Sequence, residues 1–316
     1  MADHAVENED MFVYRGGQAP RHITHARIDE SVEEIEEGAF CGCTNLVYVK
    51  THNRIRKIGH RAFFHCKSLP RIDIKSVVEI GQRGFSRCEK LQFVEFGDKL
   101  ESIGTYAFGL CCIIEHLKFP SVVSIADAVF LDCTRLIDVE FTETLERLST
   151  WAFSGCRSLQ RIAIPLKRGL FSDDHVFDNC DQLTRVDLVG GVHQTVASLH
   201  MESWRAEMKV EINTINRDLP SMDPDSKTRV IRQWMDSIID RMDYYKAEHC
   251  ILVNEAASLL ELALWKANLN EKHDYVERTT KRAEIDNDGD VRKEKRVTCG
   301  ADTVIKNVLP FLQLLE

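Results

Sequence analysis

The chain has 316 residues, of which 44% are hydrophobic and 29% charged, and its formal net charge is -9. Its length and apolar content suffice for a substantial core and two ordinary domains, which excludes a wholly disordered chain. Acidic residues outnumber basic ones in every part of the chain, so we expect no nucleic-acid partner, and no apolar run approaches the roughly 18 residues of a membrane span.

The first 22 residues predict a tail and a first strand. Residues 1–10 are acidic and lack the apolar run of a secretory signal, which predicts an intracellular protein, cytoplasmic or nuclear. Residues 11–14 are expected to form a short strand that stops at the turn Gly16-Gly17. Residues 23–28 then repeat half of a unit that recurs later, as the atypical first unit of a repeat array does.

A phenylalanine and a cysteine three residues later recur at intervals of 22 to 24 residues. The pairs are Phe40 and Cys43, Phe63 and Cys66, Phe85 and Cys88, Phe108 and Cys111, Phe130 and Cys133, Phe153 and Cys156, and Phe177 and Cys180. A fixed period of this length predicts a solenoid, in which each unit buries its apolar face against its neighbours. The cysteines are predicted to be buried free thiols that act as small hydrophobes.

Each unit contains two apolar clusters. The first, such as Ile55 and Ile58, precedes Gly-x-x-Ala-Phe and predicts a tight turn or a short 3₁₀ segment. The second, such as Leu69, Ile72 and Ile74, ends with period-two alternation and predicts a strand with one buried face. Stacked at about 4.8 Å per unit, these strands form a parallel sheet on one side of a curved rod.

The motif Ile-Gly-x-x-Ala-Phe-x-x-Cys-x-x-Leu-x-x-Val-x-Phe resembles the BspA-like class of leucine-rich repeats over about residues 23–189. The resemblance implies an α/β fold, namely a leucine-rich repeat solenoid with a parallel β-sheet. The solenoid would consist of a half-repeat cap followed by seven repeats. Later segments, residues 198–204, 245–249, 259–267, 297–301 and 305–311, resemble predicted diatom proteins that carry the same repeats. Bacterial relatives of this class are typically surface adhesins.

Residues 190–316 predict a helical region, an α-helical hairpin or bundle. The seventh unit is irregular at residues 165–171, and a helical period begins after Gly190-Gly191. We expect one amphipathic helix over residues 195–218, an N-cap at Asp223, and a long helix over residues 224–268 with a nearly continuous heptad seam. The two helices are expected to pack as an antiparallel pair.

The second half of the long helix is apolar on more than one face, between Val253 and Trp265. Such a helix needs a cover, and residues 301–315 form the nearest apolar segment able to supply one. The turn-rich stretch between them predicts a loop around residues 279–298.

The concave face of a curved solenoid is its usual binding surface. We predict that two outward rows line it. The first row is His25, Tyr48, Arg71, Phe93, His116, Asp138, Arg161 and Arg185, and the second is Arg27, Lys50, Asp73, Glu95, Lys118, Glu140, Ala163 and Asp187. The candidate partner-binding residues are Tyr48, Arg71, Phe93, His116, Asp138 and Arg161, because large aromatics on a polar face are typical of binding hot spots. An ordinary mixed-charge sheet face is the alternative.

The sequence favours neither catalysis nor a cofactor. The pairs Cys41 with Cys43 and Cys111 with Cys112 lack zinc-site spacing. Residues 286–290 match a calcium loop only at its first acidic places, so a polar turn is expected there. No catalytic or phosphate-binding motif occurs.

These patterns leave three hypotheses. The first is a non-enzymatic scaffold that binds a protein or peptide through the concave face. The second is an assembly module in which the long helix joins another chain to form an oligomer, with the solenoid as a rigid spacer. The third is an enzyme with an unrecognised site.

Overall fold

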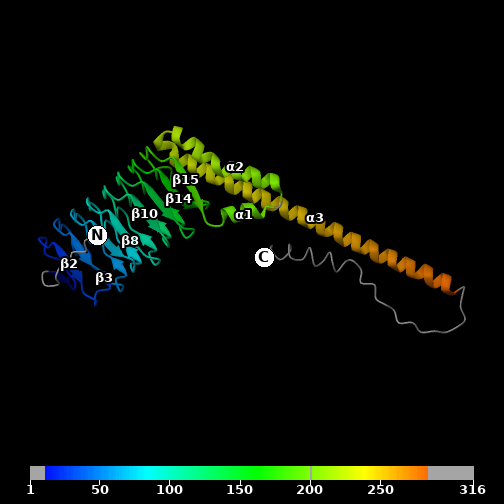
Figure 1. Ribbon diagram of the computed structural model, residues 1–316, viewed down its shortest axis with the longest axis horizontal. Helices are drawn as coiled ribbons and strands as arrows, with labels where there is room; N and C mark the ends of the chain where they lie inside the picture. The colour runs from blue at the N-terminus through cyan, green and yellow to red at the C-terminus, as the bar shows by residue number, and fades with distance from the viewer. Residues whose placement is uncertain (1–10, 200, 284–316) are drawn as a thin grey trace, which may run out of the picture. The chain divides into compact units, whose positions relative to one another are not determined.

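The computed structural model describes residues 11–199 and 201–283, with side chains to residue 268. Contacts divide the chain into one compact unit that ends at Tyr245 and a second that begins at Lys246. The first unit is a parallel β-solenoid of about seven turns with a helical pair at its C-terminal end, and α3 continues into the second unit (Figure 1). No helix in the described residues is long and apolar enough to cross a membrane.

The predicted strands form one column along the solenoid (Figure 1). They are β1 (Phe12–Tyr14), β2 (His25–Ile28), β4 (Tyr48–Lys50), β6 (Arg71–Ile74), β8 (Phe93–Phe96), β10 (His116–Phe119), β12 (Asp138–Phe141), β14 (Arg161–Pro165) and β15 (Arg185–Val189). The column is parallel throughout and is hydrogen-bonded in three segments, β1-β2-β4, β6-β8 and β10-β12-β14-β15. The first strand, the strand predicted in residues 23–28 and all seven later strands are therefore confirmed.

A second parallel sheet, which the sequence did not predict, runs along another side of the solenoid. Its strands are β3 (Glu34–Ile35), β5 (Lys57–Ile58), β7 (Glu79–Ile80), β9 (Ser102–Ile103), β11 (Ser124–Ile125) and β13 (Arg147–Leu148). Two residues are too short to show an alternating pattern, so only stacking reveals them as strands. The glycine after β5 explains the Ile-Gly pair: a Cβ at Gly59 would lie 2.7 Å from the Ile35 carbonyl of the preceding turn.

The Phe-containing turn links successive units through its backbone. It is a hydrogen-bonded turn with two residues in the left-handed region, for example Arg61 at φ 52° and His65 at φ 63°. Such residues are strained by about 1–3 kcal/mol each. The N–H groups of Arg61, Phe63 and His65 donate to carbonyls of the next turn at 2.9, 2.7 and 2.9 Å. These bonds between turns offset the strain, which is why residues other than glycine are tolerated there.

The repeated phenylalanines form a continuous column of fully buried rings. Successive ring centroids lie 5.0–5.9 Å apart with nearly parallel planes, and Tyr14 covers the first ring at 5.1 Å. Each cysteine from Cys66 to Cys180 donates its S–H to the phenylalanine carbonyl of the preceding turn at 3.1–3.2 Å. Burial raises the pKa of the Cys88 thiol to about 12, so this side chain is a protonated, structural group.

The seventh turn keeps the pattern despite its irregular sequence. Leu170 and Phe171 are buried where other turns have their first apolar cluster, and Phe171 forms a parallel bridge with Leu148 of β13. The Phe171 ring packs edge-on against Phe177, with centroids 5.8 Å apart. The residues between Pro165 and Leu170 therefore add length to the loop without breaking the core.

The helical region begins with two helices, α1 (Val192–Ser198) and α2 (Glu202–Asp218), followed by η2 (Leu219–Ser221). The single helix predicted over residues 195–218 is wrong, because the backbone is extended at Leu199 and Met201. Asp223 caps η3 (Pro224–Ser226) as expected, since its side chain accepts from the N–H of Asp225.

The long helix α3 runs from Lys227 to Ala283, beyond the predicted end at residue 268. The loop predicted around residues 279–298 is therefore helical at its start, to Ala283. The remainder of that loop, the calcium-like stretch at 286–290 and the covering segment at 301–315 lie outside the described residues.

Helices α2 and α3 form the predicted antiparallel pair. The ring of Trp204 near the start of α2 stacks on Tyr245 at 4.9 Å, and the Tyr245 hydroxyl donates to Glu207. Nearer the connection, the indole N–H of Trp234 donates to the Glu211 carbonyl at 3.0 Å. The apolar seam is buried as far as Tyr245.

The helical pair closes the open end of the solenoid by supplying the acceptors that an eighth turn would supply. The Phe177 N–H, which in other turns reaches a backbone carbonyl, donates to Thr228 Oγ1 at 2.9 Å. The Asn179 N–H donates in the same way to Asp225 Oδ1 at 3.3 Å. A buried end without such partners would be costly, so these side chains complete the backbone hydrogen bonding.

Two further side chains cap the same end. The Asn216 amide accepts from the Val186 N–H at 2.7 Å and donates to the Val186 carbonyl at 3.2 Å, as a neighbouring strand would. The buried Lys227 ammonium donates to the carbonyls of residues 180, 181 and 183 at 2.9, 3.0 and 3.0 Å. Burial lowers the pKa of Lys227, and three acceptors match its three N–H donors.

We predict that Phe108→Ala lowers the free energy of unfolding by about 3–5 kcal/mol, because it opens a cavity inside the ring column. Phe108 is fully buried and contacts the rings of Phe85, Phe96 and Phe130. Denaturant melts followed by circular dichroism measure the loss. The exposed Phe93→Ala is the control and should change stability by no more than about 0.5 kcal/mol. Equal losses in the two variants would contradict the buried column.

A second prediction concerns the cap. Lys227→Met keeps the length of the side chain but leaves three carbonyls without their donor, so we expect a loss of about 2–4 kcal/mol. The matched control is Lys209→Met on the exposed face of α2, which should be nearly neutral. Unfolding midpoints in urea compare the two. If both variants melt together with the wild type, the ammonium does not hold the end of the solenoid.

Candidate partner-binding face

The strand face consists of the outward-facing residues of the long strands from β2 to β15. Inward positions such as Ile72 and Val139 are buried, while the alternating positions point away from the core. Backbone pairing aligns these outward residues across the strands. In the first row His25 is paired with Tyr48, and Arg71 is paired with Phe93. Farther along, each residue is paired with the next one in the series His116, Asp138, Arg161 and Arg185. All six predicted residues therefore belong to the first row.

Two large aromatic side chains stand exposed on this polar face. Tyr48 is 41% exposed and Phe93 is 58% exposed, although each lies on a strand of the column. Arg71 between them and His116 beyond them are also exposed. The His25 ring lies 6.1 Å from that of Tyr48 and lengthens the aromatic row. The four side chains from Tyr48 to His116 are thus available to a partner.

The C-terminal part of the first row is occupied by its own ion pairs. The Arg161 guanidinium contacts Asp138 at 2.9 Å and Asp187 at 2.6 Å, and Arg185 contacts Asp187 at 2.9 Å. Burial opposes ionisation of Asp187, but hydrogen bonds from Arg185 and Arg161 outweigh it and lower the pKa. The predicted residues Asp138 and Arg161 are half-buried and satisfy each other.

The N-terminal part of the second row is different. Arg27 of β2 lies in register with Lys50 of β4, and both are exposed. Neither has an ion-pair partner among the residues that the structure describes. Farther along the row the charges are paired, since Lys118 contacts Glu140 at 2.9 Å. Two adjacent cations therefore lack a counter-charge beside Tyr48.

A polar cavity of about 550 Å³ adjoins these strands, formed by loops that follow β4, β6 and β8. Its lining includes Asp73 of the second row and the side chains of His52, Arg54, Arg56, Lys75, Asp98 and Lys99. Arg54 pairs with Glu33 at 3.3 Å and Lys75 with Glu95 at 2.5 Å. Sequence reasoning missed this cavity, although basic residues after successive strands were a signal that could have indicated it.

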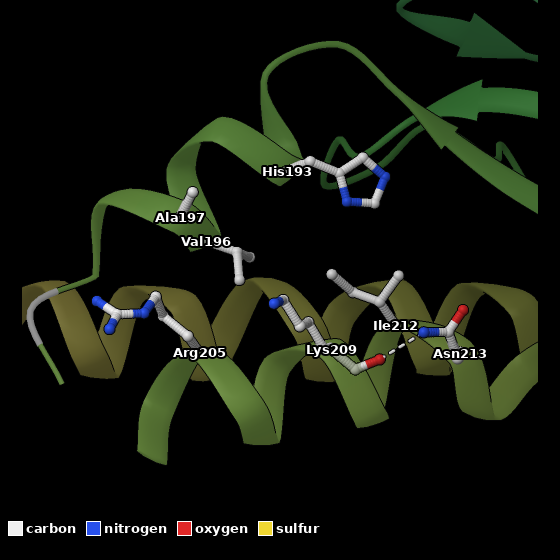
Figure 2. Close-up of a pocket in the computed structure, with 7 residues that line it drawn as sticks. All are labelled: His193, Val196, Ala197, Arg205, Lys209, Ile212 and Asn213. Carbon is white, nitrogen blue, oxygen red and sulfur yellow. Dashed lines mark hydrogen bonds between the residues drawn. The ribbon is translucent and has the colours of Figure 1, made fainter. Parts of the chain in front are cut away.

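A smaller cavity of about 340 Å³ lies between α1 and α2, as Figure 2 shows. Val196 and Ile212 form its apolar wall. Arg205 donates a hydrogen bond to the Leu199 carbonyl at 2.6 Å. The residues that line the cavity include no carboxylate and no thiol. It is a packing gap beside a short helix, without the paired titratable groups that acid–base chemistry needs.

Among the described residues, no group of three His, Cys, Asp or Glu side chains is arranged to hold a metal ion. Cys43 and Cys111 belong to the buried thiol column, and burial raises the pKa of Cys43 to about 11. A thiol of this kind is poorly suited to ligate a metal as thiolate. The strand face is therefore the best candidate site.

A match to a known protein family agrees with this fold. The family described as "BspA type Leucine rich repeat region" matches residues 19–124 and 111–213, with six copies. No curated protein matches the chain significantly.

Among solved structures, the leucine-rich repeat protein of T. pallidum is 26% identical, with a TM-score of 0.44, over 56% of this chain and 83% of that one. A leucine-rich cell surface protein of Faecalibacterium prausnitzii is 22% identical, with a TM-score of 0.38, over 54% and 62%. The pneumococcal vaccine antigen PcpA is 17% identical, with a TM-score of 0.37, over 56% and 54%.

Proposed function

Because the chain belongs to the BspA-type leucine-rich repeat family, whose solenoids are generally protein-interaction modules, we propose that it is a non-enzymatic scaffold that binds a protein or peptide through the strand face. The strand face carries the outward rows that the sequence pattern assigns to the expected concave face. The binding residues in the proposal are Tyr48, Arg71, Phe93 and His116.

The observation that carries the proposal is the exposure of Tyr48 and Phe93 on regular strands. A soluble sheet face usually presents polar residues to water, and exposed aromatics on a rigid support are typical of hot spots. The strands fix the backbone positions of both residues before binding, which reduces the entropy lost when a partner docks. Asp138 and Arg161 contribute to the shape of the face through their mutual ion pair.

The test is a random-peptide display selection with the full chain. We expect that changing Tyr48, Phe93 and His116 together to Ala removes at least about 90% of the selected binders, since truncating two or three hot-spot residues costs several kcal/mol. Melting curves should stay nearly unchanged, because the three side chains are exposed.

The matched control changes Trp151 and Tyr244 to Ala, two exposed aromatics outside the strand face. These variants should keep the selected binders. Binders that survive the triple change and vanish with the control would locate binding elsewhere and contradict the proposal.

The second half of α3 supports a second candidate function, assembly of two chains. Leu259, Leu262 and Trp265 are 67%, 66% and 70% exposed, and Ile251 and Leu252 are also exposed. Exposed apolar residues gathered on one helix favour a helical partner. We propose that the same residues of a second copy of the chain cover them in a dimer. We also propose that the helical region makes this chain a member of the diatom-type group that it resembles.

Light scattering tests the assembly. We expect a wild-type dimer at micromolar concentration, and dissociation at least about tenfold easier for Leu259→Glu with Leu262→Glu, because charges would enter an apolar contact. Val210→Glu, at an exposed apolar position of α2, is the control. A wild type that is monomeric at about 100 μM would contradict this second candidate.

We also propose an intracellular location. The cysteines in the described part of the chain are free thiols, which suits a reducing compartment.

A further inference from the structure

We propose that the N-terminal part of the strand face, together with the adjoining polar cavity, binds an extended acidic peptide that also carries an aromatic or aliphatic side chain. This inference rests on the proposed function and names the chemistry of its partner. The cationic patch that receives the carboxylates consists of Arg27, Lys50, Arg56 and Lys99.

Charge is distributed unevenly along the strand face. The outward positions of β2, β4, β6, β8 and β10 carry four cations and two carboxylates, whereas those of β12, β14 and β15 carry two cations and three carboxylates. The whole chain has a net charge of -9, so the positive excess at this end is local. A local field of opposite sign to the rest of the protein attracts a partner of complementary charge.

The two carboxylates at the outward strand positions of this end, Asp73 and Glu95, already contact cations. Glu95 contacts Lys75 at 2.5 Å and Arg71 at 3.6 Å, and the hydrogen bond from Lys75 lowers the pKa of Glu95. Asp73 contacts Lys75 at 3.9 Å. These carboxylates therefore contact Lys75 and Arg71, and neither contacts Arg27 or Lys50.

The cationic patch, in contrast, lacks internal partners. Its four members have no ion pair among the described residues. Arg27 and Lys50 are directly opposite each other on neighbouring strands, where like charges repel. Arg56 and Lys99 line the adjoining cavity with Asp73, which is also part of the strand face, so the patch continues from the sheet into the cavity. A ligand carboxylate between these cations relieves the repulsion.

The spacing of the face suits an extended chain. Tyr48 and Lys50 are two residues apart on β4 and point to the same side. Alternate side chains of an extended peptide are also about 6.6 Å apart and share one side. When an apolar side chain of the peptide contacts Tyr48, the residue two positions farther along the peptide therefore lies near Lys50. An Asp or Glu at that position forms an ion pair with Lys50.

A nucleic acid fits this face less well than a peptide does. Aromatic and basic residues together can bind single strands, but a phosphate backbone requires continuous positive charge. Here Asp73 and Glu95 interrupt the cations on adjacent strands. A peptide with separate carboxylates and an apolar residue between them avoids these two positions.

Fluorescence anisotropy with the full chain tests the inference. The probe is a fluorescein-labelled 12-residue peptide of Glu and Asp with one Phe and one Leu. Three comparison probes are the same peptide with Gln and Asn in place of the acids, the same peptide with Ser in place of Phe and Leu, and a 12-nucleotide oligothymidine. The variant is Arg27→Glu with Lys50→Glu. Its control, Arg147→Glu with Arg157→Glu, makes the same change in charge at exposed positions away from the strand face.

The expected result is saturable binding of the acidic peptide that weakens at least about tenfold in the Arg27 and Lys50 variant and is retained in the control. Binding should also weaken as salt rises from about 50 to 300 mM, since exposed charges are screened. Both comparison peptides should bind less well than the acidic one.

Equal affinity for the Gln and Asn peptide, equal loss in the two variants, or tighter binding of oligothymidine would overturn the inference. The display selection separates this failure from that of the proposed function. Selected peptides that are neutral yet depend on Tyr48 and Phe93 would leave the scaffold proposal standing and remove only the acidic partner. Loss of dependence on those aromatics would remove both.

Discussion

Each inner turn of this solenoid makes ring contacts and hydrogen bonds with both the turn before it and the turn after it. The ring of each repeated phenylalanine between Phe40 and Phe177 stacks on two others, and its backbone N–H donates to the following turn while its carbonyl accepts the S–H of the next turn's cysteine. These contacts recur at a fixed place because the chain returns to the same position after 22 to 24 residues. Left-handed residues in the turn are tolerated only because this stacking supplies their hydrogen bonds.

The same dependence makes the two ends of the solenoid exceptional. At the first end Tyr14 replaces a phenylalanine ring, and its hydroxyl accepts from the Glu36 N–H at 3.3 Å. At the other end four polar side chains of the helical region, led by the buried Lys227, take the place of a missing turn. The helical pair up to Tyr245 thus serves the stability of the solenoid, whatever the remainder of α3 contacts.

Because the turns of the solenoid are joined in this way, the outward side chains of the strand column have a regular spacing. The strand face uses that property in two ways. Toward β15 the charged side chains form ion pairs with one another. Toward β2 the aromatic side chains are exposed and the cations of the patch have no ion-pair partner among the described residues. Recognition is consequently expected where the internal pairing stops. The proposed function and the acidic partner both follow from this contrast within one sheet.

The sequence by itself determined the period, the strand column and the outward position of the six candidate residues in the first row, because burial of one face forces apolar residues into a pattern that recurs in every unit. It also indicated the antiparallel pair of α2 and α3 through a long apolar seam. Only the tertiary structure revealed the second sheet and the break between α1 and α2, since two-residue strands and one extended segment leave no periodic trace. It also decided that Asp138 and Arg161 pair with each other while Arg27 and Lys50 do not, because ion pairing depends on which neighbours stacking brings within about 4 Å. The roles of Asn216, Asp225, Lys227 and Thr228 were likewise hidden, because a cap is defined by contacts across tens of residues.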